Sequence, residues 1–311
     1  MNILIADSLS PEAVQRLRAG GAAVDDRSGI GADELLAAIP KVHGLIVRGR
    51  TKVTAPLLAA AAQLKVVGRA GVGVDNIDLV AAAARGVAVV NTPVSTSVAV
   101  AELTFALMLS LIREIPRADA ALKQGLWLKK ELEGSELAGK TLGIIGVGNI
   151  GAQVARRAAA FDMQVLGYDP LLDGPTLRAR GAAPVSLDDL YARADFITLH
   201  LPLLPETRGL LDAQAFARMR PGVYLVCAAR GGVIAEADLL AALNKGQVAG
   251  AALDVFQKEP PDPSPLISHS RVVVTPHIGA QTAEAQRRAA LDVAEEVLNA
   301  LQGKQLRWQV K

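Results

Sequence analysis

Three polar residues in the last third of the sequence, Arg230, Glu259 and His277, each come shortly after an apolar run. A guanidinium can hold a carboxylate through paired hydrogen bonds, and an imidazole can take or give a proton near neutral pH. A carboxylate beside the imidazole would orient the ring and stabilise its charged form. Together the three predict acid–base chemistry on a hydroxyl group next to a carboxylate. Taken singly, Arg230 fits a surface ion-pair partner, Glu259 a residue of a solvated turn and His277 a packed core histidine equally well.

A glycine-rich turn lies upstream, in GIIGVGNIG at 143–151, where Gly146, Gly148 and Gly151 have GxGxxG spacing. In that motif the glycines allow a tight turn, the approach of a pyrophosphate and close packing of a helix on its strand. Asp169 ends the next apolar run, 18 residues after Gly151. This separation is close to the ~20 residues expected between the motif and a ribose-binding acid. Its carboxylate would bind the ribose 2′-hydroxyl and repel a 2′-phosphate, which predicts NAD rather than NADP. A glycine turn used only for packing is the alternative.

Short β-rich runs alternate with alanine- and leucine-rich helical runs along the chain. Strands are predicted in two sets, at 2–7, 42–48, 64–70 and 87–91, and then at 140–148, 164–169, 195–200, 223–229, 250–256 and 271–277. Helices are predicted between them and at the end of the chain, at 11–19, 55–63, 79–86, 98–115, 150–161, 187–194, 212–219, 236–246 and 283–303. Buried strands separated by helices predict parallel sheets, and the two sets predict two doubly wound α/β domains.

The predicted sheets explain how the three polar residues could meet. In a parallel sheet the carboxyl ends of all strands lie at one edge, and ligands bind there. Arg230, Glu259 and His277 follow three successive strands of the second set. They are therefore expected to converge where the nicotinamide of a bound NAD would lie.

Composition argues against several classes of protein. The 311 residues are 51% hydrophobic and 3% aromatic, with a net charge of +2, which does not favour a nucleic acid or membrane partner. The first residues lack the basic region of a signal peptide, and the single Cys227 cannot form an internal disulfide, so a cytoplasmic location is expected. No paired-cysteine or clustered-histidine pattern is present, so no metal site is expected.

With these residues placed, the chain resembles the D-isomer-specific 2-hydroxyacid dehydrogenases over nearly its whole length. The resemblance is carried by ordered blocks: VRGRTKVT (47–54), VVGRAGVGVDNIDL (66–79), NTPVSTSVAVAELT (91–104), GKTLGIIGVGNIG (139–151), YDP (168–170), HLPLLPETRGLL (200–211), CAARGGVIAEADLLAAL (227–243), AALDVFQKEP (251–260) and TPHIGAQTAEA (275–285). It implies a flavodoxin-like substrate-binding domain, residues 1–95 plus 284–311, with an NAD-binding Rossmann domain, residues 96–283, inserted in it. It also implies a homodimer, joined by the apolar helix at 98–115, and leaves open whether dimers pair into tetramers.

The resemblance assigns roles to individual residues. Arg230 would bind the substrate carboxylate and carbonyl, His277 would be the acid–base group, and Glu259 would pair with His277. The NAD site would include Gly146, Gly148, Asn149, Ile150, Gly151, Asp169, Pro202, Thr207, Ala228, Asp254 and Gly279.

For the substrate, the resemblance implies a small 2-hydroxy or 2-oxo acid. The backbone amides of Val72 and Gly73 would meet its carboxylate, and Arg48 and Arg50, on the loop after a strand, could hold a phosphate. Lys129 lies where an arginine of a partner subunit reaches the phosphate in such enzymes. For the two arginines, a solvated basic loop is the alternative.

Departures from the family pattern keep the substrate open. Gly49 stands where a serine is usual, and Thr96 stands at an asparagine position. The resemblance implies NAD-dependent oxidation of 3-phosphoglycerate, and reduction of hydroxypyruvate or glyoxylate on the same fold is the alternative. A protein that binds NAD as a sensor, without catalytic turnover, is a further alternative. Because the sequence ends near residue 311, a C-terminal regulatory domain is not expected.

Overall fold

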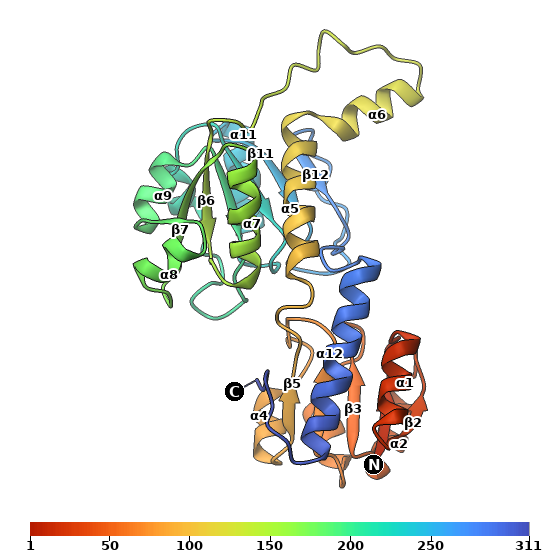
Figure 1. Ribbon diagram of the computed structural model, residues 1–311. Helices are drawn as coiled ribbons and strands as arrows, with labels where there is room; N and C mark the ends of the chain where they lie inside the picture. Colours follow the sequence, from red (N-terminus) through yellow and green to blue (C-terminus); the bar gives the residue numbers. More distant parts are fainter. Residues whose placement is uncertain (311) are drawn as a thin grey trace. The chain divides into compact units, whose positions relative to one another are not determined.

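The computed structural model describes residues 1–310 and divides them into two α/β units (Figure 1). The first unit consists of Met1–Ser97 together with the chain from Ala280 onward, and the second is Val98–Gly279. The sequence places the corresponding domain boundaries at residues 95 and 284. The first unit is thus made of two separate parts of the chain, and the second is continuous.

The first unit is built on a five-stranded, wholly parallel sheet with the strand order β2-β1-β3-β4-β5. The strands are β1 (Asn2–Ile5), β2 (Ala23–Asp26), β3 (Gly44–Val47), β4 (Val66–Arg69) and β5 (Ala88–Val90). The helices are α1 (Pro11–Ala19), α2 (Ala32–Ala38), the 3-10 helix η1 (Ile39–Lys41), α3 (Ala55–Ala60), α4 (Leu79–Ala84) and α12 (Ala283–Leu301). This is the flavodoxin-like order, and the prediction for this part of the chain is confirmed.

Both faces of this sheet are covered by helices. One core forms between the sheet and the side that carries α1 and α12, and a second forms under α2, α3 and α4. Gly68 in β4 shows how close α12 lies, because a Cβ there would come within 2.5 Å of Val297 and 2.7 Å of Val293. A glycine at this position therefore allows the long helix to pack directly on the strand.

The last described residues return to the edge of this sheet, where Gln309 forms an antiparallel bridge with β5. Glu296 of α12, whose side chain is fully buried, holds this segment. Its carboxylate accepts the amide N–H groups of Arg307 and Trp308 at 2.8 and 3.1 Å, and the Nε–H of Arg307 at 3.1 Å. The buried charge is thus matched by donors from the segment that covers the sheet edge.

Replacement of Glu296 by glutamine is expected to lower the free energy of unfolding by about 2 kcal/mol, since charge-assisted hydrogen bonds are lost in a buried site. Urea unfolding of the intact chain measures the effect. Glu295→Gln is the matched control, because the Glu295 side chain is 44% exposed and its ion pairs with Arg16 and Arg307 are long, at 3.9 and 3.7 Å. The control is expected to change stability by less than ~0.5 kcal/mol. Equal effects of the two variants would contradict this account.

The second unit has a seven-stranded parallel sheet with the order β12-β11-β10-β9-β6-β7-β8. Its strands are β6 (Thr141–Ile145), β7 (Gln164–Tyr168), β8 (Ala183–Pro184), β9 (Phe196–Leu199), β10 (Val223–Cys227), β11 (Val248–Leu253) and β12 (Val272–Val274). Its helices are α5 (Ser97–Ile112), α6 (Ile115–Lys123), α7 (Asn149–Ala160), α8 (Gly174–Ala179), α9 (Leu187–Arg193), α10 (Ala213–Arg218) and α11 (Glu236–Lys245). The strand order reverses between β6 and β9, as in a Rossmann fold.

Two cores lie on opposite faces of this sheet, one under α5, α7 and α8 and the other under α9, α10 and α11. The prediction of a single helix at 98–115 is wrong at its C-terminal end. Helix α5 stops at Ile112, Glu114 has a left-handed backbone with φ of +50°, and α6 begins with Pro116 in its first turn. Proline has no amide N–H to continue the hydrogen-bonding of the preceding helix, so a new helix starts there.

Within residues 1–310, no helix combines the length and the apolar character that a membrane crossing requires.

Candidate active site

The predicted glycine-rich turn joins β6 to α7, at the position where the strand order of the larger sheet reverses. Gly146 has φ of +89°, and a Cβ there would lie 2.6 Å from the carbonyl oxygen of His200. A Cβ on Gly151 would overlap the Gly146 carbonyl, so α7 packs directly on the turn. A Cβ on Gly148 would meet nothing within 4 Å. The residues present therefore leave open space before a 12-residue helix, which suits the pyrophosphate of a dinucleotide.

Asp169 directly follows β7, the strand beside β6. Its Oδ2 accepts the amide N–H of Val147 at 3.0 Å, and its Oδ1 accepts that of Leu171 at 3.0 Å. Asn149 and Ile150 begin α7 at the same turn. The structure thus brings Asp169 to the glycine-rich turn and the start of α7, as a ribose-binding acid requires.

The loop after β9 carries two further predicted NAD residues, Pro202 and Thr207. The Thr207 hydroxyl donates to the Pro202 carbonyl at 2.6 Å and accepts the amide N–H of Leu204 at 2.8 Å, which holds the loop in a compact turn. Ala228, also a predicted NAD residue, is buried directly after β10. Because β6, β9 and β10 are parallel neighbours, these positions share the carboxyl edge of the sheet with the glycine-rich turn.

The strands that precede Arg230, Glu259 and His277 are also neighbours, since β10 pairs with β11 and β11 pairs with β12 in parallel. The Nη1 of Arg230 donates to the preceding carbonyl at 2.7 Å. A Cβ on Gly231 would overlap the carbonyl of Phe256, so the loop after β10 packs backbone to backbone against the loop that leads to Glu259. The structure thus places the three predicted catalytic residues on adjoining loops.

His277 and Glu259 are in direct contact, with 2.7 Å between the Nδ1 of the ring and the Oε2 of the carboxylate. The other carboxylate oxygen accepts the amide N–H of Phe256 at 3.1 Å. Glu259 is therefore held by its own loop and in turn holds one ring nitrogen. The His277 side chain is 49% exposed, so the ring reaches the surface of its unit.

The turn that carries His277 is held by Asp254, which is fully buried at the end of β11. One carboxylate oxygen accepts the Thr275 hydroxyl at 2.6 Å and the amide N–H of Ile278 at 2.8 Å, and the other accepts the amide N–H of Gly279 at 2.8 Å. His277 has φ of +53°, a left-handed conformation that is uncommon outside glycine. The carboxylate of Asp254, one of the predicted NAD residues, thus fixes the turn on both sides of the histidine.

The predicted substrate residues fall into two places. Val72 and Gly73 follow β4, and within residues 1–310 no hydrogen bond uses either amide N–H as a donor, so both can meet a carboxylate. Arg48 and Arg50 follow the neighbouring strand β3, at the same edge of the smaller sheet. Lys129 belongs to the other unit, where it is exposed in the irregular segment after α6.

Two other titratable side chains lie at the carboxyl edge of the larger sheet. Burial lowers the pKa of His200 to about 3, so its ring is neutral at physiological pH, and its Nε2 lies 3.1 Å from the Thr198 hydroxyl. Burial raises the pKa of the Cys227 thiol to about 11, so the thiol does not ionise near neutral pH. Neither His200 nor Cys227 therefore changes its charge near neutral pH.

Residues 105–279 match the family model described as "D-isomer specific 2-hydroxyacid dehydrogenase, NAD binding domain". The chain is 51% identical over 303 residues to a D-3-phosphoglycerate dehydrogenase of Mycobacterium tuberculosis and 47% identical over 304 residues to one of Rattus norvegicus. The chain belongs to the D-isomer-specific 2-hydroxyacid dehydrogenase family. A crystal structure of a glyoxylate reductase from Paecilomyes thermophila, another similar protein, has 31% identity and a TM-score of 0.92, with 100% of this chain and 98% of that chain covered.

Membership in this dehydrogenase family confirms the predicted NAD cofactor and the Rossmann domain. The two aligned curated relatives cover 97% and 98% of this chain, whereas the chain spans 57% of the length of each. The roles of the individual site residues remain predictions.

Proposed function

We propose that this protein oxidises 3-phosphoglycerate to 3-phosphohydroxypyruvate with NAD, the first step of serine biosynthesis. The observation that carries the chemistry is the 2.7 Å contact between His277 Nδ1 and Glu259 Oε2. Arg230 lies on an adjoining loop, and all three residues follow strands at the same sheet edge as the glycine-rich turn. The substrate is suggested by the 45–51% identity to relatives named D-3-phosphoglycerate dehydrogenase.

In the proposed reaction, the Arg230 guanidinium binds the substrate carboxylate and polarises the oxygen on the adjacent carbon. The Nε2 of His277 takes the hydroxyl proton while the hydrogen on the same carbon leaves with its electron pair. Glu259 keeps Nδ1 protonated and stabilises the imidazolium that forms. Bound NAD supplies the hydride acceptor. In the reverse direction His277 returns the proton to the carbonyl oxygen.

Reduction of glyoxylate or hydroxypyruvate is the second candidate. The similarity to the glyoxylate reductase structure, with a TM-score of 0.92, supports it, as does Gly49 in place of the usual serine. The same His277, Glu259 and Arg230 would serve this reaction, and only the contacts to the far end of the substrate would differ.

Steady-state turnover, followed by NADH absorbance, tests the proposal. The substrates are 3-phosphoglycerate with NAD, and phosphohydroxypyruvate, hydroxypyruvate and glyoxylate with NADH. We expect kcat/KM for the phosphorylated 2-oxo acid to exceed that for its unphosphorylated counterpart by a factor of about 100, the effect of roughly 3 kcal/mol of phosphate binding. A preference for hydroxypyruvate or glyoxylate would establish the second candidate instead. NADH binding without turnover of any of these acids would favour an NAD-sensing protein.

Replacement of Asp169 by asparagine is expected to lower kcat/KM for NAD about tenfold or more and to raise the relative use of NADP. The amide keeps an acceptor for the Val147 N–H, but it loses the charge that binds a ribose 2′-hydroxyl and repels a 2′-phosphate. Steady-state kinetics with both cofactors measures the ratio. An unchanged NAD to NADP preference would contradict the role proposed for Asp169.

We also propose that the chain forms a homodimer through α5, α6 and the irregular segment that follows them. In Figure 1 this segment projects from the rest of its unit. Large apolar side chains are exposed in α6 and after it, namely Ile115 at 51% and Leu122 at 60% in the helix, and Leu126 at 52% and Trp127 at 76% in the segment that follows. Several large apolar side chains exposed on one short stretch of chain are typical of an interaction surface. Light scattering at twice the chain mass would support the proposal, and scattering at the chain mass would overturn it.

A further inference from the structure

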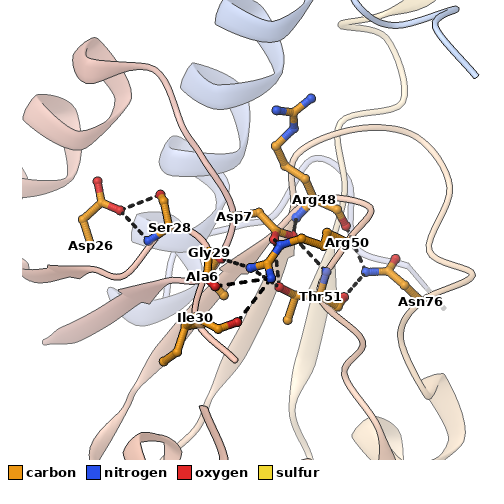
Figure 2. A network of polar contacts seen from close by, with 10 residues as sticks. All are labelled: Ala6, Asp7, Asp26, Ser28, Gly29, Ile30, Arg48, Arg50, Thr51 and Asn76. Carbon is orange, nitrogen blue, oxygen red and sulfur yellow. Dashed lines mark hydrogen bonds and ion pairs between the residues drawn. The ribbon is translucent and has the colours of Figure 1, made fainter. Parts of the chain in front are cut away.

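Asp7 is a buried carboxylate at the carboxyl edge of the smaller sheet, just beyond β1 (Figure 2). Its Oδ2 accepts the amide N–H groups of Arg48 and Thr51 at 2.7 and 3.2 Å, and its Oδ1 accepts the Thr51 hydroxyl at 2.8 Å. Burial alone would raise the pKa of Asp7, but these hydrogen bonds and the Arg50 charge outweigh it and hold the pKa below its usual range. Asp7 is therefore ionised at neutral pH and holds both ends of the 48–51 loop.

The side chain of Arg50 is 54% exposed, but each of its three guanidinium nitrogens has a hydrogen-bond partner in the protein. Its Nε donates to Asp7 at 3.0 Å, its Nη2 donates to the Ala6 carbonyl at 2.8 Å, and its Nη1 donates to the carbonyls of Gly29 and Ile30 at 3.5 and 3.3 Å. Figure 2 shows this fork lying among the loops that follow β1, β2 and β3. Movement of the side chain toward a ligand would break the ion pair with Asp7 and remove the hydrogen bonds to the carbonyls of Gly29 and Ile30.

The side chain of Arg48 behaves differently, because it points away from this network (Figure 2). Its Nη2 makes a 3.3 Å hydrogen bond to Gln281 Oε1, a neutral acceptor that an anion would readily displace. Arg48 also lines a cavity of about 360 Å³ together with Ser10, Gln286 and Arg287. Of the two arginines on this loop, Arg48 is therefore the one whose guanidinium is less committed to partners within the described chain.

We propose that Arg50 is a positioning residue: together with Asp7 it fixes the 48–51 loop, so that Arg48 alone presents a guanidinium to the anionic end of the substrate. The nature of that end, a phosphate, rests on the function proposed above. The positioning role rests on the contacts of Asp7 and Arg50. It differs from the simpler expectation that both arginines bind the phosphate together.

A double-mutant cycle separates positioning from direct binding. Arg48→Ala and Arg50→Ala are each expected to raise KM for the phosphorylated substrate about tenfold, with kcat within about twofold, as for the loss of one binding contact. The double variant is expected to be no worse than Arg48→Ala, since Arg50 acts only through Arg48. Effects that multiply would show that Arg50 binds substrate directly and would overturn the proposal.

Two further variants guard against unfolding and nonspecific charge effects. Arg50→Lys keeps a cation for Asp7 but loses the fork to the carbonyl groups, so a partial recovery of KM relative to Arg50→Ala is expected. Lys52→Ala removes an exposed cation from the same loop and is expected to leave KM unchanged. An equal rise in KM for Lys52→Ala would show that only the overall positive charge matters, and would also overturn the proposal.

Hydrogen exchange tests the positioning role without relying on activity. The amide protons of Arg48 and Thr51 are held by Asp7, so Arg50→Ala and Asp7→Asn are expected to speed their exchange by about tenfold or more, while exchange in the β9 and β10 strands stays the same. Unchanged exchange at these two amides would overturn the proposal. If the wild-type enzyme does not use 3-phosphoglycerate, the substrate assignment fails, whereas the exchange result still decides whether Arg50 fixes the loop.

Discussion

Replacement of His277 by alanine is expected to lower kcat by a factor of about 10²–10⁴ and to leave the Kd for NADH within about threefold of the wild-type value. The imidazole is the proton carrier in the proposed reaction, and its Nδ1 is held by Glu259 at 2.7 Å. The glycine-rich turn and Asp169, which form the proposed nucleotide site, make no use of the ring. Steady-state kinetics and NADH fluorescence titration provide the two measurements.

His269→Ala is the matched control for this experiment. His269 lies outside the proposed site. Its Nδ1 accepts the amide N–H of Arg271, two residues along the chain, at 3.1 Å. This variant is expected to retain wild-type kcat. If His277→Ala lost turnover and NADH binding to the same degree, the side chain would be supporting the cofactor site rather than moving a proton.

Replacement of Asp254 by alanine is expected to lower the free energy of unfolding by about 3 kcal/mol and kcat by a factor of about 100. The fully buried carboxylate holds three donors, which are the Thr275 hydroxyl and the amide N–H groups of Ile278 and Gly279. Without it these donors lose their partner, and the left-handed backbone at His277 loses the contacts that maintain it. Thermal unfolding and steady-state kinetics measure the two effects.

Asp254→Asn offers a milder version of the same change, because the amide oxygen can still accept part of the hydrogen bonding. It is expected to give an intermediate loss of both stability and kcat. Asp262→Ala removes an exposed acid that pairs with Lys258 and is expected to change neither quantity by a measurable amount. Retention of wild-type kcat in Asp254→Ala would show that the turn keeps its shape without the carboxylate.

The strands of both sheets could largely be predicted because they are buried apolar runs. β3 and β9 are wholly buried, and such runs between helices are typical of parallel sheets. β2 has the sequence AVDD at the edge of its sheet, where three of its four residues are exposed, so it carries no apolar signal. β8 has only two residues, which is too short for any periodic pattern.

The positions of the candidate site residues could be predicted where those residues directly follow predicted strands. Arg230, Glu259 and His277 each follow a strand, and adjacency in the parallel sheet brings their loops together. The contacts that hold those loops depend on distant partners. Arg50 and Asp7 are 43 residues apart, and no local pattern indicates that the arginine is committed to the buried acid. Gly231, whose Cβ would overlap a neighbouring loop, could have been suspected from the GG pair in CAARGGV.

The discontinuity of the first unit has a consequence for the order in which the chain folds during synthesis. The ribosome releases Met1–Ser97 first, but one face of their sheet is completed by Val293 and Val297 of α12, which emerge late. Val98–Gly279 is continuous and can close its own cores before α12 leaves the ribosome. The unit that is made first is therefore finished last, and its nascent sheet offers an apolar face to chaperones until α12 has been synthesised.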